Sequence, residues 1–353
     1  MKLTKLRNRF SELHIDGMII TSEFNRRYMT GFTGTAGIAV ISEDRAVFIT
    51  DFRYVEQANN QVEGFEVIEH KGPIIEEVAN QVKNLGIKKL GFEEDHLTYR
   101  EYSLYAKEIK TAELLPVCGA VEKLRLIKSK TEIKILKEAA DIADATYKHI
   151  LTFVRQGLTE VEVANELEFF MRKNGAASSS FDIIVASGYR SALPHGVATD
   201  KVIEKGDFVT LDFGAYYKGY CSDITRTFAV GEPSVELKKI YSIVQEAQLR
   251  GMNGIKPGMT GKQADALTRD YINEQGYGKF FGHSTGHGLG MEVHEGPTLS
   301  IKSDTILQPG MVVTVEPGIY VGGLGGVRIE DDTVITESGN ESLTHSPKDL
   351  IVL

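Results

Sequence analysis

The chain contains the segment GDFVTLD at residues 206–212 and repeats its pattern as GMVVTVE at residues 310–316. Each segment begins with glycine, continues as a mostly apolar run that contains a threonine, and ends in a carboxylate. β-Branched and aromatic residues favour extended backbone, so each segment is predicted to be a buried strand. The carboxylates at the two strand ends are Asp212 and Glu316.

The repeat includes the helices that precede these strands. Residues 157–159 (GLT) open a helical pattern that ends at Gly175, and residues 258–260 (GMT) open another that ends at Gly276. Repetition at two levels of organisation favours an internal duplication over a chance match. The alternative is that Gly-apolar-Thr strands of this kind are common in any sheet.

A second acidic residue follows each strand, Asp223 in the first half and Glu330 in the second. Two similar halves that face one another would bring four carboxylates to a shared axis. The sequence therefore predicts an α+β domain with an internal pseudo-two-fold duplication.

The first third of the chain has a different pattern, in which short apolar strands alternate with helical stretches. The strands are expected at residues 17–21, 37–41 and 46–50, and one of the helices at residues 74–85. This alternation predicts an α/β domain. A long charged helical pattern then begins, so the expected domains are residues 1–122 and 123–353.

Composition excludes several classes of partner. The 353 residues have a formal net charge of -9, which disfavours nucleic acid and anionic membrane surfaces as partners. Residues 1–13 resemble an amphipathic helix more than a signal peptide, and no apolar run approaches the roughly 18 residues of a membrane span. A cytoplasmic location is expected.

Asp212 and Asp223 flank a segment that can close a hairpin with Lys218-Gly219 at its turn. A two-residue turn puts both carboxylates on one face, either directly opposite or one diagonal apart. The Cβ atoms of directly opposed residues lie about 5 Å apart, and like charges placed in this way are destabilising unless a cation neutralises them. The alternative is a pair of exposed acids on a solvated strand face.

Three further residues have side chains that could ligate a metal. His287 lies among glycines in GHGLG, which would leave the imidazole accessible. Glu316 precedes Pro-Gly, which ends its strand. Glu330 opens an acidic triplet for which a surface patch is the default interpretation, and each of the three taken singly is ambiguous.

Together, Asp212, Asp223, His287, Glu316 and Glu330 form an oxygen-rich set. Such a set suits Mn²⁺, Co²⁺ or Fe²⁺ and is less typical of Zn²⁺, so Mn²⁺ is expected. Four carboxylates carry more charge than one divalent ion balances. Two ions about 3.5–4 Å apart, sharing ligands, are a known hydrolytic arrangement.

Three other histidines are candidates for the same site. His195 and His294 each follow the repeated helix of their own half at a similar distance, so the duplication would place them on opposite sides of one cleft. Both could donate hydrogen bonds to a developing oxyanion or to the substrate. His283, four residues before His287, could line the cleft, and satisfied loop histidines are the alternative.

The sequence resembles the pita-bread metallopeptidases, the group of methionine aminopeptidase, aminopeptidase P and proline dipeptidase. The matching segments are residues 211–214 (LDFG), 222–227 (SDITRT), 286–290 (GHGLG), 315–318 (VEPG) and 327–331 (VRIED). All five expected ligands are present. Residues 25–32 and 50–54 also resemble the creatinase-type N-terminal domain of prolidases and aminopeptidase P.

The resemblance implies hydrolysis of the Xaa-Pro bond at the N-terminus of a short peptide by a hydroxide held between two metals. It implies catalytic roles for Glu316, His195 and His294, and substrate contacts from these two histidines, His283 and Arg328. A homodimer is also implied. Proline dipeptidase is favoured over Xaa-Pro aminopeptidase, with a non-catalytic binding module and a metal-free creatinase-type hydrolase as distant alternatives. Phe181, Tyr189 and Arg328 are the expected walls of the proline pocket.

Overall fold

The computed structural model describes residues 2–353 and divides into two compact units. The first unit ends at Arg125 and the second spans Leu126–Leu353. The division follows Arg125, where the sequence interpretation places it after residue 122. The α/β and α+β classes expected for the two parts are confirmed by the elements described below.

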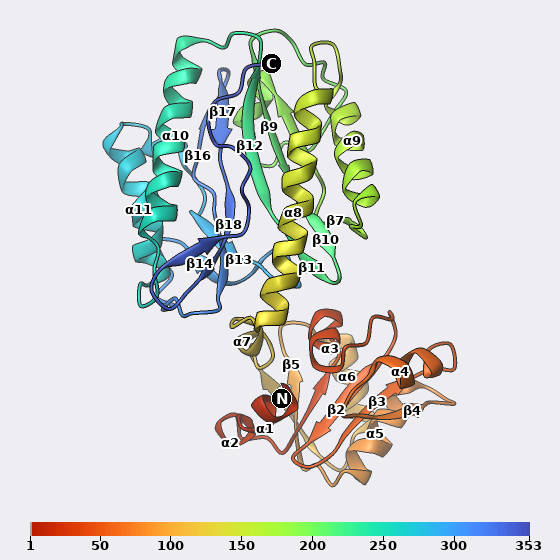
Figure 1. Cartoon of the computed structure of the whole chain (residues 1–353). Helices are drawn as coiled ribbons and strands as arrows, with labels where there is room; N and C mark the ends of the chain where they lie inside the picture. The colour runs from red at the N-terminus through yellow and green to blue at the C-terminus, as the bar shows by residue number, and fades with distance from the viewer. Residues whose placement is uncertain (1) are drawn as a thin grey trace. The chain divides into compact units, whose positions relative to one another are not determined.

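The N-terminal unit is built on one mixed six-stranded sheet (Figure 1). Its strand order is β4-β3-β2-β1-β5-β6, and the β1–β2 and β2–β3 pairs are antiparallel whereas the outer pairs are parallel. The strands are β1 (Gly17–Ile20), β2 (Ile38–Ser42), β3 (Ala46–Thr50), β4 (Glu66–Glu69), β5 (Lys89–Glu93) and β6 (Glu113–Val117). The helices are α1 (Lys2–Arg7), α2 (Phe10–Leu13), α3 (Glu23–Thr30), α4 (Val55–Gln61), α5 (Ile74–Asn84), α6 (Tyr99–Glu108) and α7 (Glu122–Arg125).

The strands and helix expected from the apolar runs of this unit are confirmed to within a residue or two. The single helix expected at residues 1–13 is wrong for the described residues, because a turn at residues 8–9 separates α1 from α2. Leu6 of α1 and Phe10 of α2 are nevertheless buried.

The C-terminal unit contains two halves with the same order of elements (Figure 1). In the first half, the helices α8 (Lys130–Phe153) and α9 (Glu160–Lys173) precede the strands β8 (Ile184–Ser187), β9 (Asp207–Phe213) and β12 (Ile224–Val230). In the second half, α10 (Val235–Gly254) and α11 (Gly261–Glu274) precede β13 (Gly286–Gly288), β15 (Val312–Val315) and β18 (Asp331–Ile335). Helices α9 and α11 both begin with a threonine capping box, at Thr159 and Thr260. The duplication inferred from the sequence is therefore present in the order of the elements.

Each half contributes one long antiparallel hairpin. In the first half, β9 pairs with β12, and the pairing continues in β10 (Ala215–Tyr217) and β11 (Tyr220–Cys221). Lys218 and Gly219 form its turn, both with positive φ, as the sequence predicted. In the second half, β15 pairs with β18, and the pairing continues in β16 (Gly318–Val321) and β17 (Gly325–Arg328). The remaining strands of the unit are β7 (Ser178–Ser179), β14 (Glu295–Leu299) and β19 (Asn340–Ser342).

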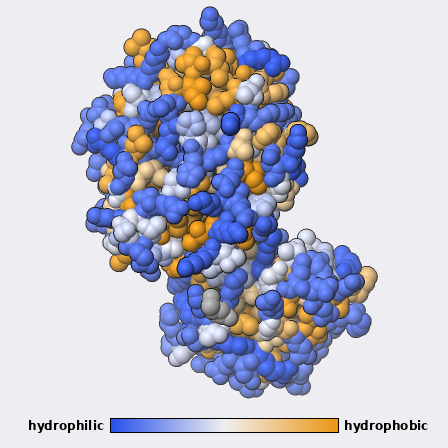
Figure 2. All heavy atoms as spheres, viewed as in Figure 1, coloured by the Kyte–Doolittle hydropathy of each residue, from blue (hydrophilic) through white to orange (hydrophobic). Residues whose placement is uncertain are grey.

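Apolar cores support both hairpins. One core packs α8 and α9 against β9 and β12 and includes Leu167, Leu211 and Phe228, all with no exposed surface. A second core packs α10 against β17 and includes Ile240 and Val327. The hairpins are thus held from behind by helices, which leaves their acidic ends to face a common cavity. Within residues 2–353, no helix is long and apolar enough to cross a membrane. Figure 2 shows a mainly hydrophilic surface with apolar atoms gathered at the end of the C-terminal unit near the chain terminus.

Glycines of the GHGLG segment allow close packing of β13 between its neighbours. A Cβ atom on Gly286 would lie 1.9 Å from the carbonyl oxygen of Thr314, and one on Gly288 would lie 1.9 Å from that of Gly296. The interpretation that these glycines clear a path to the imidazole is therefore incomplete. They let the strand that carries His287 approach β14 and β15.

We expect the substitution Gly286→Ala to lower the free energy of unfolding by about 1–3 kcal/mol or more, because the added methyl group overlaps backbone that cannot move independently. Chemical denaturation of the metal-free protein measures the change. Gly282→Ala is the matched control, since a Cβ atom at Gly282 meets no atom within 4 Å. Equal unfolding midpoints for the two variants would contradict the packing role.

Candidate metal centre

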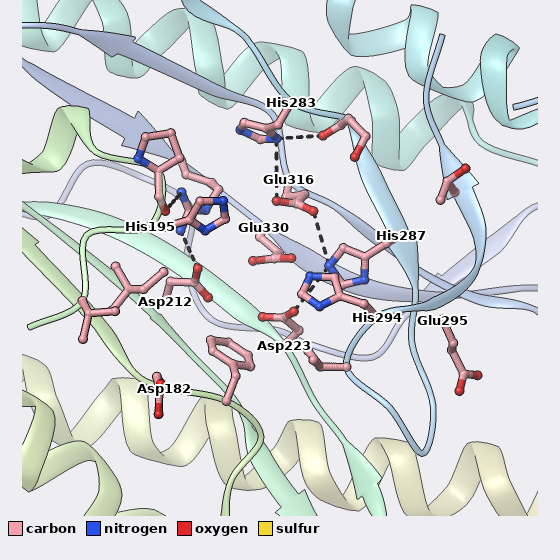
Figure 3. A pocket seen from close by; sticks show the side chains of 18 of the residues that line it. Asp182, His195, Asp212, Asp223, His283, His287, His294, Glu295, Glu316 and Glu330 are labelled. Carbon is pink, nitrogen blue, oxygen red and sulfur yellow. Dashed lines mark hydrogen bonds and ion pairs between the residues drawn. The ribbon is translucent and has the colours of Figure 1, made fainter. Parts of the chain in front are cut away.

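The two hairpins meet at a cavity of about 820 Å³ in the C-terminal unit (Figure 3). This volume lies within the usual range for small-molecule sites. All five predicted metal ligands line the cavity, together with all three predicted pocket histidines and Arg328. The predicted site residues that line the cavity are Asp212, Asp223, His287, Glu316, Glu330, His195, His283, His294 and Arg328.

Strand register explains the position of the first acidic pair. Asp212 lies opposite Thr225, and Ile224 lies opposite Phe213. Asp223, the residue before Ile224, therefore lies on the same face as Asp212 and one diagonal away from it. This is one of the two arrangements that the sequence allowed.

The second acidic pair is directly opposed. The register that pairs Val315 with Asp331 and Gly318 with Arg328 places Glu316 opposite Glu330. The backbone N–H of Glu330 donates to the carbonyl oxygen of Thr225 at 3.0 Å. This hydrogen bond joins the second hairpin to the first at the floor of the cavity.

His287 brings the two pairs together. Its Nε2 atom lies 3.6 Å from Oδ2 of Asp223 and 3.4 Å from Oε1 of Glu316. Potential ligand atoms of Asp223, His287 and Glu330 all lie within 4.8 Å of one another. These three side chains are buried and form the centre of the candidate site.

In the absence of bound cations, burial shifts the pKa values of the carboxyl groups and the imidazole at this centre. Loss of solvation and repulsion between carboxylates raise the pKa of Asp223 and Glu330 well above the ordinary values. Burial raises the pKa of Glu316 to about 8 and lowers the pKa of His287 to about 4. Oδ1 of Asp223 is buried without a hydrogen-bond partner. Crowded carboxylates, a neutral imidazole and an unsatisfied oxygen fit the binding of divalent cations.

Asp212 has a different environment from the other ligand candidates. Oδ2 of Asp212 accepts a hydrogen bond from Nη2 of Arg328 at 2.5 Å. Arg328 also donates to the hydroxyl group of Tyr320, to Pro194 O and to Thr225 Oγ1. The arginine is thus an internal partner of the cluster, with a side chain only 4% exposed.

The pocket histidines lie around the acidic centre. Figure 3 shows His195 and His294 on opposite sides of it, as the duplication predicted. The ring of His294 lies 4.2 Å from that of His287, centroid to centroid. His283 interacts with Tyr320 Oη at 2.8 Å and lies 3.9 Å from Glu316.

The apolar wall of the cavity matches the sequence interpretation only in part. Phe181 lines the cavity, together with Ile184 and Val197. Tyr189 is not among the lining residues and is 63% exposed, so its assignment to the proline pocket was wrong. It lies in the short 3₁₀ helix Gly188–Ala192, which follows the end of β8. The acidic triplet that Glu330 opens is fully buried, which excludes the surface patch.

Three supporting residues were missed from the sequence. Thr225 donates to Glu330 Oε2 at 2.6 Å, Asp332 accepts from the backbone N–H of Asp223, and Tyr320 links His283 to Arg328. Strand alternation gave a signal for Thr225, because it lies two residues after Asp223 and therefore on the same face. The same alternation gave a signal for Asp332, two residues after Glu330, whereas Tyr320 depends on contacts between distant segments that no local pattern indicates.

Family models match both units of the chain. Residues 134–337 match metallopeptidase family M24, and residues 2–127 match the creatinase/prolidase N-terminal domain. The chain belongs to metallopeptidase family M24. The resemblance inferred from the five motifs is confirmed, and with it the pita-bread fold of the catalytic domain.

Solved structures of family M24 members extend over the whole chain. A structure described as Xaa-Pro dipeptidase from Bacillus anthracis is 68% identical, with a TM-score of 0.99, and covers 100% of this chain and 99% of that one. X-Pro aminopeptidase from Thermotoga maritima is 43% identical, with a TM-score of 0.92, over 98% and 100% of the two chains. Prolidase from Pyrococcus horikoshii is 41% identical, with a TM-score of 0.94, over 99% of each chain. Membership of family M24 implies a dinuclear centre of divalent metal ions, which the residues described above fit.

We expect the metal-free protein to lose stability as the pH rises from about 4.5, the ordinary pKa of the Glu316 carboxyl group, to about 8, its value in the folded protein. A carboxyl group with a pKa raised by folding stabilises the folded state while it is protonated, and this contribution is lost as the pH rises through the folded value, about 8 for Glu316. Urea denaturation of the chelator-treated protein across this pH range measures the effect. Glu316→Gln should weaken the dependence, and stability that increased over the same range would contradict the assignment.

Proposed function

We propose that the chain is an Xaa-Pro dipeptidase that uses two divalent metal ions. The observation that carries this proposal is a set of four carboxylates and one imidazole that line a substrate-sized cavity, with Asp223, His287 and Glu330 buried and Asp212 and Glu316 half-buried. The substrate class is supported by the M24 relatives from Bacillus anthracis and Pyrococcus horikoshii, which are described as Xaa-Pro dipeptidase and prolidase.

The metal ligands in this proposal are Asp212, Asp223, His287, Glu316 and Glu330. Their oxygen-rich composition favours Mn²⁺, with Co²⁺ or Fe²⁺ as alternatives. When bound, such ions lower the pKa of a water molecule and polarise the carbonyl group that is to be cleaved. The chain contributes the geometry, because the hairpin registers fix which carboxylates lie opposite or diagonal to one another.

The remaining catalytic roles fall to residues on either side of the acidic centre. His195 and His294 are placed to donate hydrogen bonds to the oxygen that becomes negative as the carbonyl carbon turns tetrahedral. Glu316 is proposed to take the proton of the attacking water and to deliver it to the leaving proline nitrogen.

The proline ring requires a pocket, because its nitrogen has no hydrogen to donate to a β-strand ladder. Phe181, Ile184 and Val197 give one part of the cavity an apolar lining suited to the ring or to the residue before it. His283 and Arg328 are proposed to contact substrate as well. Arg328 has most of its donors already engaged with protein atoms, so its contact would be through few remaining hydrogens.

Removal of metal tests the proposed function directly. We expect EDTA to abolish hydrolysis of an Xaa-Pro dipeptide and added Mn²⁺ or Co²⁺ to restore it. Activity that persists in a preparation shown by elemental analysis to lack metal would support a creatinase-type hydrolase. If the protein binds metal but cleaves no Xaa-Pro peptide with any of the metals tested, the result would support a non-catalytic binding module.

A second candidate is an Xaa-Pro aminopeptidase that acts on longer peptides. Among the cavity-lining residues, all within the described part of the chain, Arg328 is the one arginine or lysine, and it is already paired with Asp212. A dipeptide presents its terminal carboxylate next to the proline, where a cationic partner would be expected. The cavity is therefore poorly suited to bind a free terminal carboxylate, which favours substrates that continue beyond the proline. The relative from Thermotoga maritima is described as an X-Pro aminopeptidase.

Three matched substrates separate the two candidates: Xaa-Pro, its C-terminal amide, and Xaa-Pro-Yaa. For a dipeptidase we expect kcat/KM to fall at least about tenfold on amidation, which corresponds to about 1.4 kcal/mol of lost transition-state binding. For an aminopeptidase the amide and the tripeptide should be cleaved as well as the dipeptide or better. Steady-state kinetics with the Mn²⁺-loaded protein give the answer.

A homodimer and a cytoplasmic location stay predictions.

A further inference from the structure

A buried ionic cluster lies directly behind Glu330 and does not line the cavity. Its centre is Arg226, a residue with no exposed surface. All five of its N–H groups are engaged, in bonds that point to both hairpins and to the end of the chain. The acceptors are Thr225 O, Glu330 O, Asp331 Oδ1, Ser346 O and Pro347 O.

Asp331 is the matching anion, and its carboxylate is saturated. Oδ1 accepts from Arg226 and from the hydroxyl group of Thr344, and Oδ2 accepts from Gln248 and Lys348. Burying such charges costs several kcal/mol each, which pairing only partly offsets. A buried cluster of this kind therefore need not add stability. What needs an explanation is that it holds its members in one fixed geometry.

The chain end supplies much of this cluster. We call residues 344–349 the C-terminal strap. Asp144 of α8 accepts from the backbone N–H groups of His345 and Ser346, and Tyr241 of α10 donates to Lys348 O. Beyond the strap, backbone bonds join Ile351 and Leu353 to β12. Figure 1 shows the chain end beside β12.

Three hydrogen bonds hold Glu330, one to Arg226 of the cluster and two to the neighbouring residue Thr225. The carbonyl oxygen of Glu330 accepts from Arg226, its N–H donates to Thr225 O, and its Oε2 accepts from the hydroxyl group of Thr225. Arg226 also donates to Thr225 O, so one guanidinium group holds both the candidate ligand and the residue that orients its carboxylate.

We propose that Arg226, Asp331 and Lys348 are positioning residues for the metal centre, and that the C-terminal strap sets the affinity of the cavity for metal through Glu330. None of the three lines the cavity. The proposal rests on the proposed metal function. Residues that orient metal ligands typically contribute 10- to 100-fold to metal affinity.

Lys348→Met is the primary variant, because this lysine is at the edge of the cluster, with a side chain 23% exposed, and Arg226→Lys is the second. Lys137→Met is the matched control, since it removes a lysine that pairs with Glu341 on the surface of the same unit. Tyr241→Phe is a structural control that loosens the strap without removing a charge. Lys348→Arg, which restores a cation next to Asp331, tests rescue.

Isothermal titration of each metal-free, folded protein with Mn²⁺ is the primary readout, with the metal-free unfolding midpoint measured beside it. We expect Lys348→Met and Arg226→Lys to bind Mn²⁺ about tenfold or more weakly, Lys348→Arg to recover most of the loss, and Lys137→Met to match the parent protein. A merely structural cluster would lower the unfolding midpoint and leave the affinity of the folded protein unchanged.

Lys348→Met decides the question if Arg226→Lys fails to fold. Affinities within about twofold of the parent for the folded cluster variants would overturn the positioning role while leaving the proposed function intact. An equal loss of affinity in Tyr241→Phe, which loosens the strap without removing a charge, would support the role of the strap and overturn the separate assignment to the charges of Arg226, Asp331 and Lys348. Failure of the parent protein itself to bind Mn²⁺, Co²⁺ or Fe²⁺ would instead overturn the proposed function.

Discussion

The C-terminal unit depends on one electrostatic constraint, the burial of several carboxylates at one point. Asp223, Glu316 and Glu330 all have raised pKa values, with desolvation as the largest cause and neighbouring carboxylates as a further one. Like charges in a medium of low polarity repel strongly. The fold can hold them together only because helices and apolar cores brace the hairpins from behind, and because cations can neutralise the cluster from the cavity side.

The triplet Glu330-Asp331-Asp332 shows how the fold separates neighbouring acids. Burial raises the pKa of Asp331, but the charges of Arg226 and Lys348 outweigh it, and the pKa of this carboxyl group lies below its usual value. Burial raises the pKa of Glu330 and Asp332, which have no such pair of cations. Strand alternation directs adjacent side chains to opposite faces. The face with Asp331 is thus neutralised by the protein's own cations, and the candidate ligand Glu330 lies on the opposite face.

Much of this arrangement was predictable from local sequence. The repeated strands, the threonine caps and the Lys218-Gly219 turn follow from periodicity and turn chemistry, which act over a few residues. The links among Arg328, Tyr320 and Asp212 were not predictable, because they join distant segments. The packing role of the glycines around His287 was not predictable for the same reason, since the backbone that they approach comes from β14 and β15.

The duplication also explains why the two acidic pairs differ. Both halves end a strand in a carboxylate, but the register places Asp212 and Asp223 diagonally and Glu316 and Glu330 directly opposite each other. In general the Cβ atoms of directly opposed residues lie closer together than those of diagonal neighbours. A strict repeat would have given two equal pairs. The difference in register gives the cavity two unlike pairs instead. The carboxylates at the two strand ends also differ in environment, since Asp212 is paired with Arg328 whereas Glu316 lies 3.4 Å from His287.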